Sequence, residues 1–290
     1  MLTKQSGVFS TAGFFCCLVL FACGASHNNG SANVNKTTRP KVPVFPHQAN
    51  FLASYCLSHV FPGKDAAERK ACLSENQKRK HTHFYVYPYN ENDCSEWGSP
   101  SFDYYQDPQT FRNLLLEIVD AGMGPVVWLF PDDAPNLHLN TSISEYQEIL
   151  SNLIPVIDDE VSSYVLGLEL DEYFSEIEIE MVGAHLDSLT DKKIGLHFSP
   201  GLTTGIENEW ADYLVYQYGF GNNESQMRSE TQAVLDVVYM QYGKPLVAGE
   251  YSLFTNSPES EAIRLGDAAM SADPIMRSFG FGNGGSPLVP

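Results

Sequence analysis

Short apolar runs that alternate with amphipathic helical patterns are the feature that most constrains this chain of 290 residues. Each run carries few charges and is bounded by turn or cap residues, which is typical of strands buried on both faces of a parallel sheet. We expect strands at residues 51–57, 84–87, 125–130, 165–170, 193–198, 212–217, 245–249 and 275–281. Most of the connections between them are long enough for a crossover helix, as parallel pairing requires.

Helix signals occupy most of these connections. Asp107 is placed to cap a helix that starts at Pro108 and stops at Gly122. Two further helices should open on capping boxes, formed by Ser144 with Gln147 and by Ser175 with Glu178. Apolar periodicity also predicts helices over 65–80, over 225–242 and from 257 onward. No full helix is expected after the strand at 193–198 or after the last strand.

Strands that alternate with helices throughout residues 51–290 predict an α/β fold, a single (β/α)8 TIM-barrel domain with reduced fifth and eighth helices. The alternative is an open doubly wound sheet, which binds its ligand at one switch point beside a Gly-rich phosphate loop. No such loop follows the first expected strand, and polar residues follow nearly every strand. The pattern therefore favours the barrel.

The amino terminus has the pattern of a targeting segment. Lys4 is its single charge, and the apolar run from Val8 to Ala22 is too short for a membrane-spanning helix. The run ends in Leu20-Phe21-Ala22-Cys23, which resembles the lipobox of bacterial lipoprotein signals. The resemblance implies a signal peptide over 1–23, lipid on Cys23, and a membrane-anchored protein facing the periplasm or the exterior, at the outer membrane if the host is Gram-negative. Residues 24–50 are rich in Asn, Ser, Pro and Thr and predict a flexible tether.

Charge and cysteine content limit the partners. The formal net charge of −19 argues against nucleic acid and against anionic membrane surfaces, because both would repel the protein. A neutral or cationic polymer is an easier partner. Cys56, Cys72 and Cys94 remain after the amino-terminal segment, and an exported protein could oxidise two of them, with the pairing left open. The sequence does not define the oligomeric state.

Three carboxylates follow the expected strand at 165–170. Strand alternation would place Leu166, Leu168 and Leu170 on one face, and Gly167, Glu169 and Asp171 on the other, with Glu172 at the exit. Carboxylates at the carboxyl end of a buried parallel strand lie where α/β proteins place their chemistry. We therefore expect a functional site at this end of the sheet.

Further polar and aromatic residues follow the other strands, and together they suit a sugar ligand. Aromatic faces stack on the C–H surfaces of sugar rings, while carboxylates and amides bind hydroxyl groups. The expected binding residues are Tyr87, Trp128, Asp132, Asp133, Glu169, Asp171, His197, Gln217, Tyr218 and Tyr251.

Two short motifs carry a resemblance to a known group. Asp171-Glu172-Tyr173 follows the fourth expected strand and Gly249-Glu250-Tyr251 ends the seventh, and this arrangement resembles the clan-A (β/α)8 retaining glycoside hydrolases. The resemblance implies that Glu172 is the general acid/base and Glu250 the nucleophile, with carboxyl groups about 5–5.5 Å apart and no cofactor. Asp171 stands where that group usually has Asn, which leaves the contact to the substrate 2-hydroxyl open.

Several alternatives stay open at this stage. A barrel of this kind could bind an envelope glycan without cleaving it. Asp132, Glu169, Asp171 and Glu250 could instead form an oxygen-ligand site for Ca²⁺ or Mg²⁺, although no loop has regular ligand spacing. Individually, Asp132 or Asp133 could cap a turn, Glu169 could be a buried structural carboxylate, and His197 could be a satisfied core histidine. The sequence contains no Gly-x-Ser-x-Gly elbow, so no motif indicates a serine hydrolase.

Overall fold

The computed structural model describes residues 61–78, 83–90, 102–130, 141–172, 174–198, 207–218, 223–244 and 246–250, and also 264, 265, 268, 269, 271, 278 and 279. The chain divides into two compact units, Met1–Val42 and Pro43–Pro290, and all described residues belong to the second. The predicted signal peptide, the whole tether and the predicted strand at 51–57 lie outside the described residues, as do Cys56 and Cys94. Cys72 is a buried thiol that forms no disulfide.

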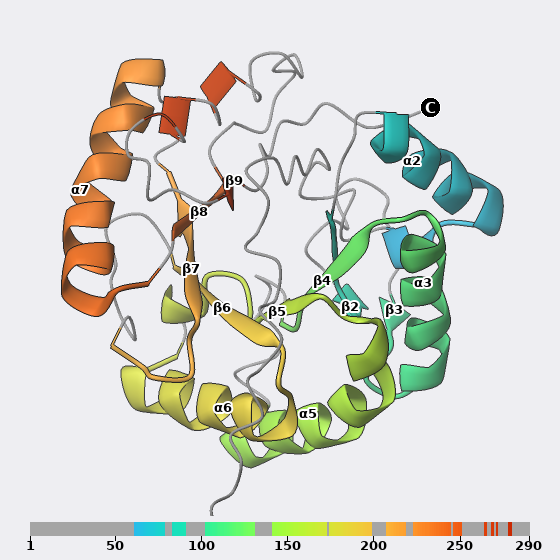
Figure 1. Cartoon of the computed structure of the whole chain (residues 1–290). Coiled ribbons are helices and arrows are strands. Elements are labelled where there is room, and N and C mark those ends of the chain that lie inside the picture. The colour runs from blue at the N-terminus through green and yellow to red at the C-terminus, as the bar shows by residue number, and fades with distance from the viewer. Residues whose placement is uncertain are drawn as a thin grey trace, which may run out of the picture. The chain divides into compact units, whose positions relative to one another are not determined.

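A parallel sheet of seven strands forms the centre of this unit. Its strands follow one another in space in the same order as in the chain, and each pairs in parallel with the next. They are β1 (His83–Val86), β4 (Gly124–Trp128), β5 (Ser163–Val165), β6 (Lys193–Phe198), β7 (Tyr213–Gln217), β8 (Leu246–Glu250) and β9 (Ser278–Phe279). The sheet is curled, as Figure 1 shows, so the α/β barrel-type architecture predicted from the sequence is confirmed.

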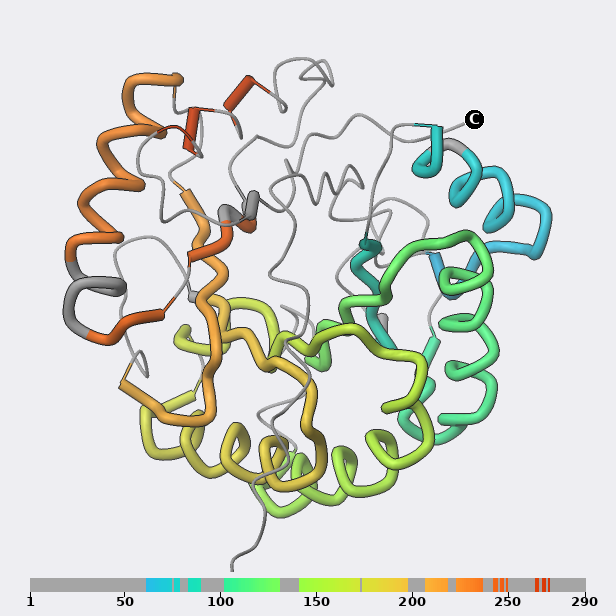
Figure 2. The backbone as a smooth tube through the Cα atoms, in the orientation of Figure 1, coloured from blue at the N-terminus to red at the C-terminus, as the bar shows by residue number. Residues whose placement is uncertain are grey.

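Helices lie outside the curled strands and connect most of them (Figure 1). They are the α-helices α2 (Ala66–Lys78), α3 (Pro108–Asp120), α5 (Ile143–Ile157), α6 (Glu176–Leu189) and α7 (Glu224–Tyr242), with the 3-10 turns η1 (Phe61–Gly63), η3 (Asp158–Glu160) and η4 (Leu170–Glu172). Helices α5 and α6 pack side by side (Figure 2). Between β6 and β7, the described residues 207–212 contain no helix, and the rest of this connection, where a reduced fifth helix was expected, lies outside the described residues. The loop expected after β1 carries a small antiparallel pair, β2 (Tyr89–Asn90) with β3 (Phe102–Asp103).

Most of the helix ends follow the predicted chemistry. Asp107 accepts a hydrogen bond from the Thr110 amide at 3.1 Å, and Gly122 ends the α3 region with a φ of +78°, which glycine adopts without steric cost. Ser175 and Glu178 form the predicted capping box of α6.

The predicted capping box at Ser144 and Gln147 is wrong. The box of α5 is formed two residues earlier, by Ser142 and Glu145. Ser142 Oγ accepts from the Glu145 amide at 3.4 Å, and Glu145 Oε2 accepts from the Ser142 amide at 2.6 Å. The helix starts earlier because Ile143 packs against the core and so belongs to the first turn.

Side chains of the strands separate into two cores. An outer core between sheet and helices includes Leu166, Leu196, Leu214 and Leu246 with apolar residues of the helices. The opposite face of the sheet carries an inner core, which consists of Tyr85, Tyr87, Val126, Trp128, Val165, Leu168, Tyr213, Val215 and Val247. Strand alternation produces this division, and the inner core is the interior that a barrel fold requires.

The strand predicted at 165–170 differs in length and in phase. Regular pairing covers only Ser163–Val165, and the chain then turns into η4. Leu166 lies in the outer core but Leu168 lies in the inner core, so the two do not share a face as predicted. The Leu168 amide still donates a hydrogen bond to the Phe130 carbonyl at 3.0 Å. This bond holds the irregular segment against the segment that follows β4.

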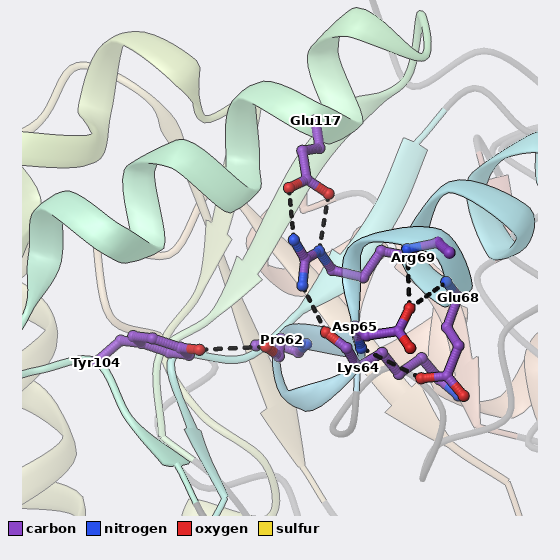
Figure 3. Close-up of polar contacts among 8 residues, drawn as sticks. Pro62, Lys64, Asp65, Glu68, Arg69, Tyr104 and Glu117 are labelled. Atoms are coloured by element: carbon purple, nitrogen blue, oxygen red, sulfur yellow. Dashed lines mark hydrogen bonds and ion pairs between the residues drawn. The ribbon is translucent and has the colours of Figure 1, made fainter.

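A polar cluster fastens α2 to α3 (Figure 3). The Arg69 guanidinium donates to both carboxylate oxygens of Glu117, at 2.8 and 2.7 Å. At the start of α2, Asp65 accepts hydrogen bonds from the amides of Ala67 and Glu68. The bidentate geometry is the strong form of an arginine–carboxylate pair.

Candidate functional site at the carboxyl end of the sheet

Three buried polar side chains lie at the carboxyl ends of strands, on the face of the inner core. Trp128 ends β4, His197 is the next-to-last residue of β6, and Gln217 ends β7. Their exposed fractions are 2%, 0% and 4%. Because Trp128 belongs to the inner core while Leu196 and Tyr216 lie in the outer core, strand alternation places all three on the inner side.

Aromatic rings surround Trp128. Its ring centroid lies 5.3 Å from that of Tyr85, 5.7 Å from that of Tyr87 and 5.1 Å from the imidazole of His197. Tyr87 and Trp128, both predicted to bind substrate, are therefore neighbours. Tyr85 was missed as a site residue, although its spacing of two from Tyr87 along one strand was a usable signal.

Each of these three polar side chains has an atom without a hydrogen-bond partner. Within the described part of the chain, Trp128 Nε1, His197 Nε2 and Gln217 Oε1 are buried and unpaired. Buried polar atoms are nearly always hydrogen-bonded, so such exceptions call for a physical reason. Atoms of this kind at the carboxyl end of a parallel sheet are suited to binding a polar ligand.

His197 is held in a defined state. Its Nδ1 lies 3.0 Å from the amide nitrogen of Glu169 and accepts that proton, so the ring's own proton resides on Nε2. Burial lowers the pKa of His197 to about 3, because the charged imidazolium cannot be solvated there. The ring is therefore neutral at physiological pH.

The three carboxylates that follow β5 lie on a turn. Glu169 has a φ of +48°, in the left-handed region that side chains other than glycine rarely adopt. The Glu172 amide closes the turn by donating to the Glu169 carbonyl at 3.0 Å. Glu169 and Asp171 are half-buried and Glu172 is exposed. The acidic residues thus have different surroundings, which strand alternation did not predict.

Glu250 is the last residue of β8 and stands opposite Gln217 of β7. The register between these strands shifts at Tyr216 and Gln217. Gly249 is required there, because a Cβ atom would lie 2.3 Å from Cγ1 of Val215. The side chain of Glu250 lies outside the described part of the structure, as do Asp132, Asp133 and Tyr251.

Tyr218 is not brought to the inner core. Its ring is fully buried in the outer core, and its hydroxyl lies 2.7 Å from Oγ1 of Thr231 on α7. Tyr218 follows Gln217 by one residue, so strand alternation puts its side chain on the opposite side of the sheet. Its position indicates a role in fastening α7 to the sheet.

Neither a metal cluster nor a membrane-spanning helix occurs in the part of the chain that the structure describes. Over these ranges, no three or more His, Cys, Asp or Glu side chains gather as metal ligands would. Among the helices that the structure describes, none combines the length and apolar character needed to cross a bilayer.

Comparison with solved structures identifies similar folds. The GH113 beta-mannanase AaManA of Alicyclobacillus acidocaldarius matches with a TM-score of 0.57 at 11% identity, covering 81% of this chain and 86% of that chain. The endo-1,4-beta-D-mannanase of Thermotoga petrophila RKU-1 matches with a TM-score of 0.56 at 11% identity, covering 80% and 87%. A beta-glucuronidase of an uncultured Clostridium sp. matches with 0.57 at 11% identity, covering 82% of this chain and 44% of that one.

These similarities place the protein in a structural class. Its curled parallel sheet has the fold of barrel glycoside hydrolases. No family model matches the sequence, and no curated protein matches it. The likeness is therefore one of fold, at an identity too low to carry residue roles.

Proposed function

We propose that this protein is an O-glycosyl hydrolase that cleaves an extracellular or envelope glycan. One observation carries the proposal: a glutamate-bearing turn after β5 and Glu250 at the end of β8 stand at the same edge of one curled parallel sheet. Barrel enzymes place their catalytic residues at that edge. Two further observations support a glycan-cleaving function. The fold is shared with two mannanases, and polar atoms of Trp128, His197 and Gln217 that are unpaired within the described ranges are buried on the inner side of the sheet.

The mechanism proposed is hydrolysis with retention. Glu172, as general acid, protonates the glycosidic oxygen while the Glu250 carboxylate attacks the anomeric carbon and forms a glycosyl ester. The aglycone leaves with that proton. Glu172 then takes a proton from water, whose oxygen attacks the anomeric carbon and releases Glu250 as the carboxylate.

Glu169 is the competing candidate for the acid/base role. It is half-buried and fastened to His197 through its amide, whereas Glu172 is exposed. Both residues belong to the same turn at the edge of the sheet, so either carboxyl is a candidate to reach the glycosidic oxygen. Separate substitution distinguishes them.

Our first prediction concerns these carboxylates. We expect Glu250→Gln to lower kcat on β-1,4-mannan by about 10³-fold or more while glycan affinity stays within a few-fold, because only covalent attack is lost. Glu172→Gln should lower kcat on mannan but retain the first step on an aryl glycoside with a good leaving group, and azide should restore turnover. Glu169→Gln is assayed in the same way, and we expect no azide rescue of this variant.

Two results would change this proposal. Azide rescue of the Glu169 variant in place of the Glu172 variant would move the acid/base role to Glu169. Glycan binding without any cleavage, by wild type and variants alike, would support the alternative, a carbohydrate-binding envelope protein. Mannan is tested first because two structural relatives are mannanases, and glucuronides are tested next.

We also propose that the mature protein is a lipoprotein anchored through Cys23. The motif Leu20-Phe21-Ala22-Cys23 supports this. As a second prediction, Cys23→Ala should move the protein from the membrane fraction to the soluble fraction and stop incorporation of labelled palmitate. Cys56→Ala is the control, and membrane association of the Cys23 variant would contradict the anchor.

A further inference from the structure

The two ring nitrogens of His197 have different surroundings. Nδ1 accepts the amide proton of Glu169 at 3.0 Å. Nε2 is buried and has no hydrogen-bond partner among the described residues. The ring lies with its centroid 5.1 Å from that of Trp128 and is fully buried. The imidazole is thus fixed at Nδ1 by the carboxylate turn 169–172 and, within the described part of the chain, unpaired at Nε2.

The residue that His197 binds is also unusual. Glu169 has a φ of +48°, a backbone conformation that costs an ordinary residue free energy and that tends to persist at functional sites. The chain has left regular strand pairing at this point, since β5 ends at Val165. The Glu169 amide therefore donates its hydrogen bond to a side chain of the neighbouring strand β6 rather than to a backbone carbonyl of the sheet.

We propose that His197 is the positioning residue for the carboxylate turn 169–172: by accepting the Glu169 amide proton on Nδ1, it holds the left-handed backbone that presents Glu169, Asp171 and Glu172 at the edge of the sheet. The same bond places the ring proton on Nε2, as a donor at the inner core. The effect on catalysis rests on the proposed function, but the hydrogen bond and the tautomer do not.

Physical chemistry supports a neutral ring in this role. An imidazolium has two donors and no acceptor, so it could not accept the Glu169 amide proton. Burial disfavours the charged form and keeps the acceptor available. A side chain that offers an oxygen at the same distance from the backbone should replace it, and an apolar side chain of similar size should not.

The test compares His197→Asn, whose Oδ1 replaces the acceptor, with His197→Leu, which removes it. Tyr213→Phe is the matched control, because it removes a buried 2.8 Å contact with Ser163 elsewhere on the inner side. We expect the wild-type imidazole to show an unprotonated Nδ1 and a protonated Nε2 by ¹⁵N NMR at neutral pH. Amide exchange at Glu169 should accelerate about tenfold or more in the Leu variant, remain within about threefold in the Asn variant, and stay unchanged in the control.

The enzymatic readout separates positioning from folding. On a glycan that the wild-type protein cleaves, we expect His197→Leu to lower kcat more than it raises KM. His197→Asn should retain most of the wild-type kcat. A protonated Nδ1, or equal exchange at Glu169 in wild type and Leu variant, would overturn the proposal. Should the Leu variant not fold, the wild-type tautomer and the Asn variant decide. If no glycan is cleaved but the tautomer and exchange results hold, the proposed function fails while the positioning of the turn stands.

Discussion

At the scale of single residues, backbone conformation and hydrogen bonding set the character of the site more than charge does. Glu169 combines a left-handed φ with an amide bonded to a buried imidazole. Glu172, only three positions later, is exposed. Neighbouring carboxylates can therefore have different roles, because the turn that carries them places each in different surroundings.

The strain at Glu169 gives a third prediction. Glu169→Gly and Glu169→Val both remove the carboxylate, but only glycine adopts a φ of +48° without a steric cost. We expect the Val variant to be less stable than the Gly variant by about 1–2 kcal/mol in urea unfolding. Ile177→Gly and Ile177→Val, at an exposed position of α6, form the control pair. There the Gly variant should be the less stable of the two, because glycine destabilises a helix. Equal stability of the two Glu169 variants would refute the strain.

At the scale of elements, specific polar contacts fasten some helices to their neighbours in addition to the apolar core. Arg69 of α2 binds both oxygens of Glu117 on α3 (Figure 3). The arginine side chain is 14% exposed and the glutamate 36%, so water screens this pair only partly. Tyr218 and Thr231 provide a similar link between the sheet and α7.

The arginine pair gives a fourth prediction. Arg69→Lys keeps the charge but loses the bidentate fork, so we expect the free energy of unfolding to fall by about 1 kcal/mol. A double-mutant cycle with Glu117→Gln should give a coupling of roughly 0.5–1 kcal/mol. Arg228, half exposed in an i,i+4 pair with Glu224 on α7, is the control. Its replacement by Lys should cost less than about 0.5 kcal/mol, and a larger loss there than at Arg69 would contradict the argument.

At the scale of the whole molecule, the buried His197 and the half-buried His83 link stability to pH. Burial lowers the pKa of His83 to about 4 and that of His197 to about 3, while both have an ordinary value of 6.5 in the unfolded chain. Below pH 6.5 the unfolded chain therefore binds more protons than the folded protein. Stability is then lost as pH falls from 6.5 toward 4.

Our fifth prediction follows from this linkage. Near pH 5, the free energy of unfolding should fall by roughly 2 kcal/mol for each pH unit of acidification. The slope has this size because both rings are neutral in the folded state and protonated in the unfolded chain. His197→Asn should remove about half of this slope. Urea unfolding of both proteins at pH 5, 6 and 7 measures it, and the comparison cancels effects of net charge that the two share. Equal slopes of the free energy of unfolding against pH in the two proteins would show that His197 does not contribute to the pH dependence of stability.

Much of the fold could be predicted from local sequence. The expected strands at 84–87, 193–198, 212–217 and 245–249 correspond to β1, β6, β7 and β8. Hydrophobic periodicity and capping chemistry are properties of neighbouring residues, so they can be read without knowledge of the rest of the chain. The capping box of α5 was misplaced because two nearby serines offered the same signal, and packing of Ile143 decided between them.

The candidate site could be predicted only in part. Trp128, His197 and Gln217 were expected at strand ends, and the structure places all three at the inner side of the sheet. The phase of the chain after Val165 could not be predicted, because it depends on contacts with Gly195 of β6 and with Phe130, which follows β4. Tyr218 was expected beside Gln217 but lies on the other side of the sheet, where α7 offers its hydroxyl a partner.

The sequence by itself therefore determined the alternation of strands and helices, and hence a parallel barrel-type sheet with polar residues at its carboxyl edge. Periodicity is sufficient for that, because burying an apolar face is a local requirement repeated along the chain. Only the tertiary structure decided the turn at Glu169, the tautomer of His197 and the side on which each ring lies. These depend on hydrogen bonds between strands that are distant in sequence, which no local pattern encodes.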